Sequence, residues 1–181
     1  MPIPGGLKKR SSPLFCLLLL LSASAQSGSA MPRVEGQNLA GNKIVLPDAA
    51  SGKITVLIFG FTRASKNPTS DWAKKIRTDF GSESRLDLYQ IPVLEQVPRL
   101  IRGMVVSGIK KGVPENQRDH FVIVVQSENE LKTFVGYKEP DDAYLVILAS
   151  DGKVAQQVHG RPEAQLYSQL KETLQSLLDG H

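Results

Sequence analysis

The stretch that decides the fold is KITVLIFGFTRASKNPTSDW, residues 53–72. Its residues 54–59 form a β-branched and aromatic run that is short enough to be a buried central strand. Small and polar residues then fill positions 60–68, and a helix is expected to begin at Thr69 or Ser70. The loop between a strand and the following helix is often a binding or catalytic site, because the N-terminal end of the helix offers free N–H groups and a positive dipole.

The first 25 residues are predicted to be a cleaved secretory signal peptide. Positive charges at residues 8–10 precede an apolar run at 14–21, and Ala23-Ser24-Ala25 has the small side chains of a cleavage site; a second possible cut follows Ala30. The apolar run is too short to span a bilayer comfortably. We therefore expect a periplasmic or secreted protein that does not span the membrane after cleavage.

Removal of the signal peptide changes the chemistry of the chain. The only cysteine, Cys16, lies inside it, so the processed chain would have no disulfide, no thiolate catalysis and no cysteine–metal site. The full chain has 22 basic and 18 acidic residues, and cleavage leaves 19 basic against 18 acidic, a net charge of +1. This near neutrality gives no reason to expect nucleic-acid binding. Residues 26–35 then form a leader and residues 36–181 a single domain.

The rest of the chain alternates between strand and helix patterns. Strands are expected at residues 42–47, 86–91, 120–125, 144–148 and 153–158, and helices at 69–80, 94–111, 129–134 and 161–178. Ser150-Asp151-Gly152 is a turn signal that should pair the last two strands as a hairpin. This order predicts an α/β fold, a mixed sheet with helices on both faces.

Regularly spaced apolar residues indicate how the helices pack. The first helix has a predicted buried stripe at residues 72, 76 and 80, and the last has one at 166, 170, 174, 177 and 178. The second helix has an apolar stripe at 94, 97, 101, 105 and 109.

From about residue 36 to residue 178 the chain resembles a thioredoxin-like domain. Residues 144–154, YLVILASDGKV, are similar to the strand–turn–strand that ends such domains, and Gly160 matches the glycine that commonly follows. Within that superfamily the chain resembles the mitochondrial ATP synthase membrane-sector assembly factor family. The most specific part of this likeness is residues 108–114, GIKKGVP, followed by residues 119–121, DHF. The resemblance implies a non-enzymatic assembly or chaperone-like factor.

The redox site of a thioredoxin is missing from this sequence. Such enzymes need a low-pKa thiolate and a resolving cysteine in the loop before the first helix, and residues 62–68 contain neither. They also place a proline just before the hairpin; that position falls near Ala143, and the nearest proline is Pro140. Two alternatives stay open: a degenerate thiol–disulfide oxidoreductase or peroxiredoxin-like relative, and a small-molecule-binding domain.

We predict a non-catalytic domain that binds a protein or peptide partner, without a cofactor or a metal ion. A helix N-terminus beside a sheet edge can receive an extended peptide through main-chain hydrogen bonds. Ser65 lacks the surroundings of a nucleophile and is interpreted as a helix cap, and the histidines share no metal-ligand spacing. Asp141-Asp142 is interpreted as a solvated turn. The expected contact residues are Thr62, Ser65, Asn67 and Pro68 in the loop, and Lys110, Lys111, Arg118 and His120 in a second segment.

Overall fold

The computed structural model describes residue 2 and residues 30–180. The predicted signal-peptide motifs and Cys16 lie outside the described residues. The elements follow in the order β1 (Val34–Asn38), β2 (Lys43–Leu46), the 3-10 helix η1 (Asp48–Ala50), β3 (Ile54–Gly60), α1 (Lys66–Phe80), β4 (Leu86–Pro92), α2 (Arg99–Gly112), the 3-10 helix η2 (Glu115–His120), β5 (Val122–Ile123), α3 (Glu128–Phe134), β6 (Ala143–Leu148), β7 (Val154–Gly160) and α4 (Ala164–Asp179).

The strands form a mixed sheet around β3, as the sequence predicts. One ladder has the order β4-β3-β6-β7 and the other has the order β2-β1-β5. Parallel bridges from Gln90 to Phe121 and from Val93 to Val124 connect the two ladders between β4 and β5. Strands β3 and β4 are parallel, whereas β6 is antiparallel to both β3 and β7. All seven residues of β3 are buried, which confirms its central position.

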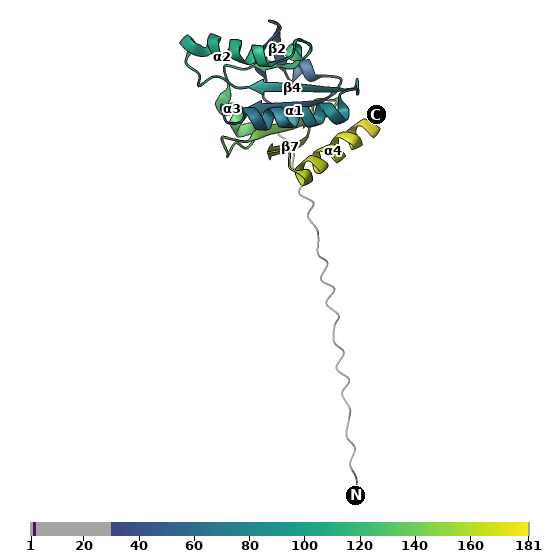
Figure 1. Cartoon of the computed structure of the whole chain (residues 1–181). Coiled ribbons are helices and arrows are strands. Elements are labelled where there is room, and N and C mark those ends of the chain that lie inside the picture. Colours follow the sequence, from purple (N-terminus) through teal and green to yellow (C-terminus); the bar gives the residue numbers. More distant parts are fainter. Residues whose placement is uncertain (1, 3–29, 181) are drawn as a thin grey trace.

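Helices cover both faces of the sheet. Because side chains alternate along a strand, Ile54, Val56 and Ile58 face α1 and α4, while Leu57 and Phe59 face the opposite core. That second core includes Leu131 and Val135 from α3 and its C-terminal end, together with residues of β2 and η1. Figure 1 shows α1 and α4 crossing one side of the sheet. The predicted α/β class and layer order are therefore confirmed.

Helix α1 has the predicted buried stripe but begins earlier than predicted. It starts at Lys66 rather than at Thr69 or Ser70, and Trp72, Ile76 and Phe80 are buried along one side. Pro68 lies within its first turn, where a missing N–H leaves no hydrogen bond unmade.

Helix α2 departs from its prediction more strongly. It begins at Arg99 instead of residue 94, because Pro98 has an extended backbone and acts as the N-cap. None of its residues is buried, so its apolar stripe does not enter the core. In Figure 1 it lies along the margin of the fold. Among residues 30–180, no helix has the length and apolarity needed to cross a bilayer.

Candidate functional site

The loop between β3 and α1 is held together by the side chain of Thr62. Its Oγ1 accepts hydrogen bonds from the backbone N–H groups of Ala64 (3.1 Å) and Ser65 (3.3 Å). The same hydroxyl donates a 2.6 Å hydrogen bond to the carbonyl of Pro140. Thr62 therefore fixes the turn that leads into α1 and joins the loop to the segment that precedes β6. The sequence predicts that the Ser65 side chain caps the helix, but Ser65 makes no side-chain cap hydrogen bond.

Ser65 faces inward, with 1% of its surface exposed. Its hydroxyl donates a 2.8 Å hydrogen bond to the carbonyl of Thr62. A Cβ atom on Gly60 would lie 2.8 Å from Ser65 Oγ, so glycine is needed at position 60 for this close approach. Pro68 is buried as well, so of the four predicted contact residues here Asn67 is exposed and Thr62 is half-exposed. The role of the loop in partner binding stays a prediction.

Three aromatic rings pack beneath the loop. The ring centroids of Phe61, Tyr137 and Tyr144 are 5.2 to 5.7 Å apart in each pair. The Tyr144 hydroxyl accepts hydrogen bonds from the N–H groups of Lys138 and Glu139 and donates one to the Glu139 carbonyl. These contacts fix the segment that leads to Pro140, so the region beside the loop is filled and internally hydrogen-bonded.

A buried ion pair supports the same region. Lys132 Nζ lies 2.7 Å from Glu128 Oε1, and Glu128 is 2% exposed. The hydrogen bond to Glu128 raises the pKa of Lys132. The same ammonium lies over the ring of Tyr137, 4.5 Å from its centroid.

The two segments expected to contact a partner lie toward opposite ends of the parallel strands. Strands β3, β4 and β5 run parallel, the loop follows the C-terminal end of β3, and residues 110–120 precede the N-terminal end of β5. The two segments therefore do not form one continuous surface.

The second segment is partly structural. Lys110 and Lys111 are exposed at the end of α2. Arg118 donates to the carbonyl of Val113 and lies 3.6 Å from a Glu115 oxygen. The His120 ring packs on Tyr89 at a centroid distance of 4.8 Å and lies 3.7 Å from a carboxylate oxygen of Asp87.

The largest exposed apolar side chains within residues 30–180 gather on and beside α2. They are Leu100, Ile101 and Met104 on α2, which we name the α2 surface, and Val125 after β5. Leu100 is 99% exposed and Met104, one turn later, 77%. Val125 lines a cavity of about 650 Å³ together with Arg102 and Val106, which lie on the opposite side of α2 from Leu100 and Met104. Soluble domains rarely expose such a group of apolar side chains unless it contacts something else.

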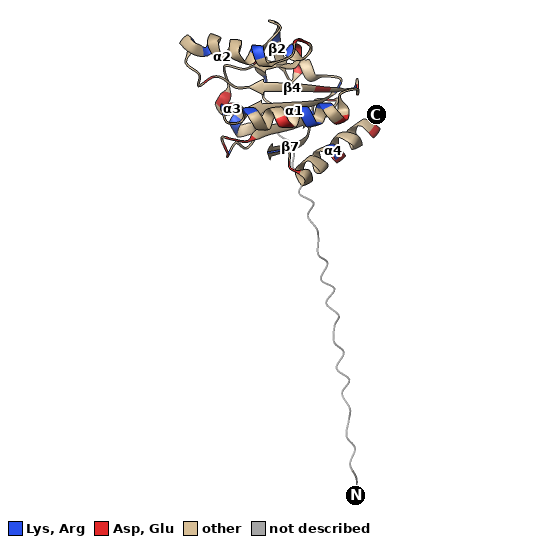
Figure 2. Ribbon diagram, in the orientation of Figure 1, with Lys and Arg blue, Asp and Glu red and all other residues tan. Residues whose placement is uncertain are grey.

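Basic residues also occur along this helix. Helix α2 contains Arg99, Arg102, Lys110 and Lys111 and no acidic residue, and Figure 2 shows blue without red along it. Sequence reasoning missed the α2 surface, although the i, i+4 spacing of Leu100 and Met104 was visible.

The acidic and histidine residues next to the hairpin have structural contacts. His159 Nδ1 lies 2.8 Å from Asp142 Oδ2, and the His159 ring stacks on Tyr144. Asp142 is half-buried by this contact, so the predicted solvated turn describes Asp141 better. Within residues 30–180 no three His, Cys, Asp or Glu side chains converge in a way that could hold a metal ion.

No protein-family profile and no curated protein matches the sequence. Solved structures do match. One match is BsSco, a member of the Sco family of cytochrome c oxidase assembly proteins in which a disulfide switch is described. Its sequence is 14% identical, the TM-score is 0.56, and the match covers 84% of this chain and 95% of BsSco. The thioredoxin domain of a thiol-disulfide oxidoreductase from Bacteroides vulgatus is 17% identical with a TM-score of 0.55, covering 80% and 95%. The fold is thioredoxin-like. The pneumococcal exposed lipoprotein thioredoxin Etrx1 from Streptococcus pneumoniae also matches, at 17% identity and a TM-score of 0.54, covering 78% and 99%.

Because the sequence identities are only 14% to 17%, these solved structures establish the fold of this chain and nothing further. Two of the names refer to disulfide or thiol-disulfide chemistry, whereas residues 30–180 of this chain contain no cysteine. The narrower resemblance to ATP synthase assembly factors is not shown by these matches and stays a prediction.

Proposed function

We propose that this protein is an exported, degenerate relative of the thiol–disulfide oxidoreductases that binds a protein partner without thiol chemistry. The named neighbours favour descent from such oxidoreductases over an unrelated binding domain. The lack of cysteine in residues 30–180 argues against redox activity of the domain itself. Export is supported by the signal-peptide pattern and by a neighbour that is described as an exposed lipoprotein.

The observation that carries the binding role is the α2 surface. An amphipathic helix of a soluble domain normally buries its apolar side, yet Leu100 and Met104 remain almost fully in water. The basic residues on the same helix favour a partner that presents apolar side chains rimmed by carboxylates. A helix of 14 residues with this pattern matches the helix-in-groove mode of recognition.

The proposed partner class is the membrane sector of ATP synthase. This class follows from the resemblance of residues 108–114 and 119–121 to the assembly factors, and part of that stretch forms the C-terminal end of α2. One neighbour belongs to a family of cytochrome c oxidase assembly proteins, so another protein with this fold is linked to the assembly of a respiratory complex. An assembly or chaperone-like role would need binding and no catalytic residue.

A photocrosslinking experiment tests this proposal. A photoreactive amino acid at position 100 of the full chain should crosslink to membrane-sector ATP synthase subunits, and the same group at exposed position 175 on α4 should not. Leu100→Ser with Met104→Ser, and separately Lys110→Glu with Lys111→Glu, should abolish the capture. Lys138→Glu with Arg161→Glu makes the same charge change away from α2 and should leave the capture intact.

Three outcomes would contradict the proposal. Equal crosslinking from positions 175 and 100 would contradict a role for α2. Enrichment of another protein set would keep the binding surface and discard the ATP synthase role. Binding to vesicles that contain anionic lipid, with no protein crosslinked, would replace the protein partner with a membrane surface.

A further inference from the structure

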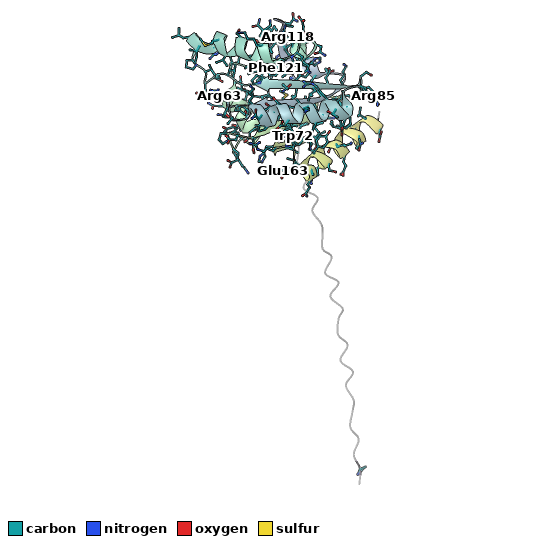
Figure 3. All side chains as sticks on the ribbon, viewed as in Figure 1. Arg63, Trp72, Arg85, Arg118, Phe121 and Glu163 are labelled. Carbon is teal, nitrogen blue, oxygen red and sulfur yellow. The ribbon has the colours of Figure 1, made fainter. Side chains whose placement is uncertain are left out.

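A second cavity, of about 590 Å³, lies between α1 and the segment that connects α2 to β5. Ser70, Lys74 and Arg77 form one wall, and their i, i+4, i+7 spacing places them along one side of α1. The facing wall is more apolar and includes Val113, Pro114 and Phe121. Figure 3 shows Phe121 on the α2 side of α1, away from Trp72 and Glu163 on the α4 side. This anion cleft, as we name it, is thus separate from both the loop and the α2 surface.

Arg77 is an uncompensated cation in this cleft. Its Nη2 donates a 3.1 Å hydrogen bond to Oε1 of Gln90, a neutral and buried side chain. No carboxylate among residues 30–180 forms an ion pair with Arg77, and burial lowers its pKa. By contrast, Arg85 is paired with Glu83. A partly desolvated guanidinium without a counter-ion costs free energy that a bound anion would recover.

The other groups lining the cleft suit the same kind of ligand. Lys74 adds a second positive charge, and the lining contains no acidic residue. Ser70, Thr78 and Gln117 add neutral polar groups. The volume lies within the range of about 300 to 1,000 Å³ that is usual for small-molecule sites.

We propose that the anion cleft binds a small organic anion. Its carboxylate or phosphate group would contact Arg77 and Lys74, and its apolar body would pack against Val113, Pro114 and Phe121. Arginine suits this role because its planar fork binds carboxylate and phosphate oxygens in a bidentate manner. The apolar wall comes from residues 112–121, which include the end of the GIKKGVP phrase and the phenylalanine of DHF. This site does not depend on the proposed partner at the α2 surface.

The test uses phenyl phosphate as the probe and benzyl alcohol as its uncharged counterpart. Titration of the full chain, followed by backbone amide chemical shifts, should move the signals of Lys74, Gly112 and Phe121 with phenyl phosphate. Benzyl alcohol should leave them in place. Inorganic phosphate should bind more weakly than phenyl phosphate, because it lacks the apolar body.

Two variants of the cleft separate the proposal from general charge attraction. Arg77→Met should weaken phenyl phosphate binding roughly tenfold or more, since a hydrogen bond to a charged group is worth about 1.5–3 kcal/mol. Lys66→Met removes an equal charge from an exposed position on α1 outside the cleft and should change nothing. Gln90→Glu places a carboxylate beside Arg77, so it should compete with the anion for the guanidinium and weaken phenyl phosphate binding.

Each opposite result would overturn the site. Equal affinity of Arg77→Met and the unaltered chain would show that Arg77 does not hold the anion. If Arg77→Met failed to fold, unchanged binding by Gln90→Glu would contradict the proposal in the same way. Equal binding of phenyl phosphate and benzyl alcohol would show an apolar site, and shifts confined to other surfaces would place the anion elsewhere.

Discussion

The hydroxyl of Thr62 donates a 2.6 Å hydrogen bond to the carbonyl oxygen of Pro140. These two residues belong to the segments that, in redox-active proteins of this fold, carry the thiols and the facing proline. In this chain the two segments are hydrogen-bonded to each other, and the Thr62 hydroxyl also fixes the turn before α1.

Thr62→Val should therefore destabilise the domain. The substitution keeps the shape of the side chain but leaves the N–H groups of Ala64 and Ser65 and the carbonyl of Pro140 without this partner. We expect a loss of about 1–3 kcal/mol in the free energy of unfolding, measured by urea denaturation. Thr133→Val removes an exposed hydroxyl that bonds within α3 and is the matched control. Equal effects of the two substitutions would contradict the structural role of Thr62.

Exposed α2 side chains should contribute little to stability. Leu100→Ser with Met104→Ser should change the free energy of unfolding by less than about 1 kcal/mol, because surface substitutions rarely do more. Ile76→Ala, in the core beneath α1, should cost roughly 2–5 kcal/mol. A large loss in the α2 variant would show that the helix packs against the domain in solution.

The contrast between α1 and α2 shows what periodicity can predict. Trp72, Ile76 and Phe80 pack on the sheet as their spacing predicts. The apolar stripe of α2 has a similar spacing, yet it stays outside the core. A helical pattern shows that a side is apolar, but it does not show whether this chain or another molecule covers that side.

The ion pair between Asp79 and Lys171 should make the contact between α1 and α4 sensitive to acid. The 2.8 Å hydrogen bond from Lys171, with a second contribution from Tyr167, lowers the pKa of Asp79 below its ordinary value of 3.8. The stabilisation is therefore complete above pH 3.8 and is lost as the pH falls through the lower pKa of the folded state. Asp79→Asn should lower the melting temperature at neutral pH, and this difference should shrink in acid. A difference that is constant with pH would contradict the ion pair.

Lys132→Met should lower the free energy of unfolding, because it leaves the buried carboxylate of Glu128 without a positive partner. The variant leaves this 2%-exposed group without its cation, which should cost roughly 3 kcal/mol. The double variant Glu128→Gln with Lys132→Met removes the charge as well and should recover part of that loss, as measured by urea denaturation. If the double variant were no more stable than Lys132→Met, Glu128 would not depend on the ammonium.

Several features needed more than local sequence. Strand β1 was missed because residues 34–38 do not alternate as an amphipathic strand does. Gly36 within β1 leaves room for β5, since a Cβ there would lie 2.6 Å from a methyl carbon of Val122. From its place in the helical pattern, Arg77 would be predicted to face solvent. The tertiary structure places Gln90 and Phe121 near it, and local sequence does not show this. Contacts between residues that lie far apart in sequence determine both features.

The measurement that tests the central claim most directly is partner capture by the Cys16→Ser variant of the full chain, under non-reducing conditions. Cys16 is the only thiol of the sequence, so any mixed disulfide with a partner must pass through it. If the domain binds its partner without thiol chemistry, the Cys16→Ser variant should capture the same proteins as the unaltered chain, and in the same amounts. Loss of capture in the variant, with a reductant-sensitive adduct in the unaltered chain, would contradict the claim and indicate an active thiol–disulfide protein.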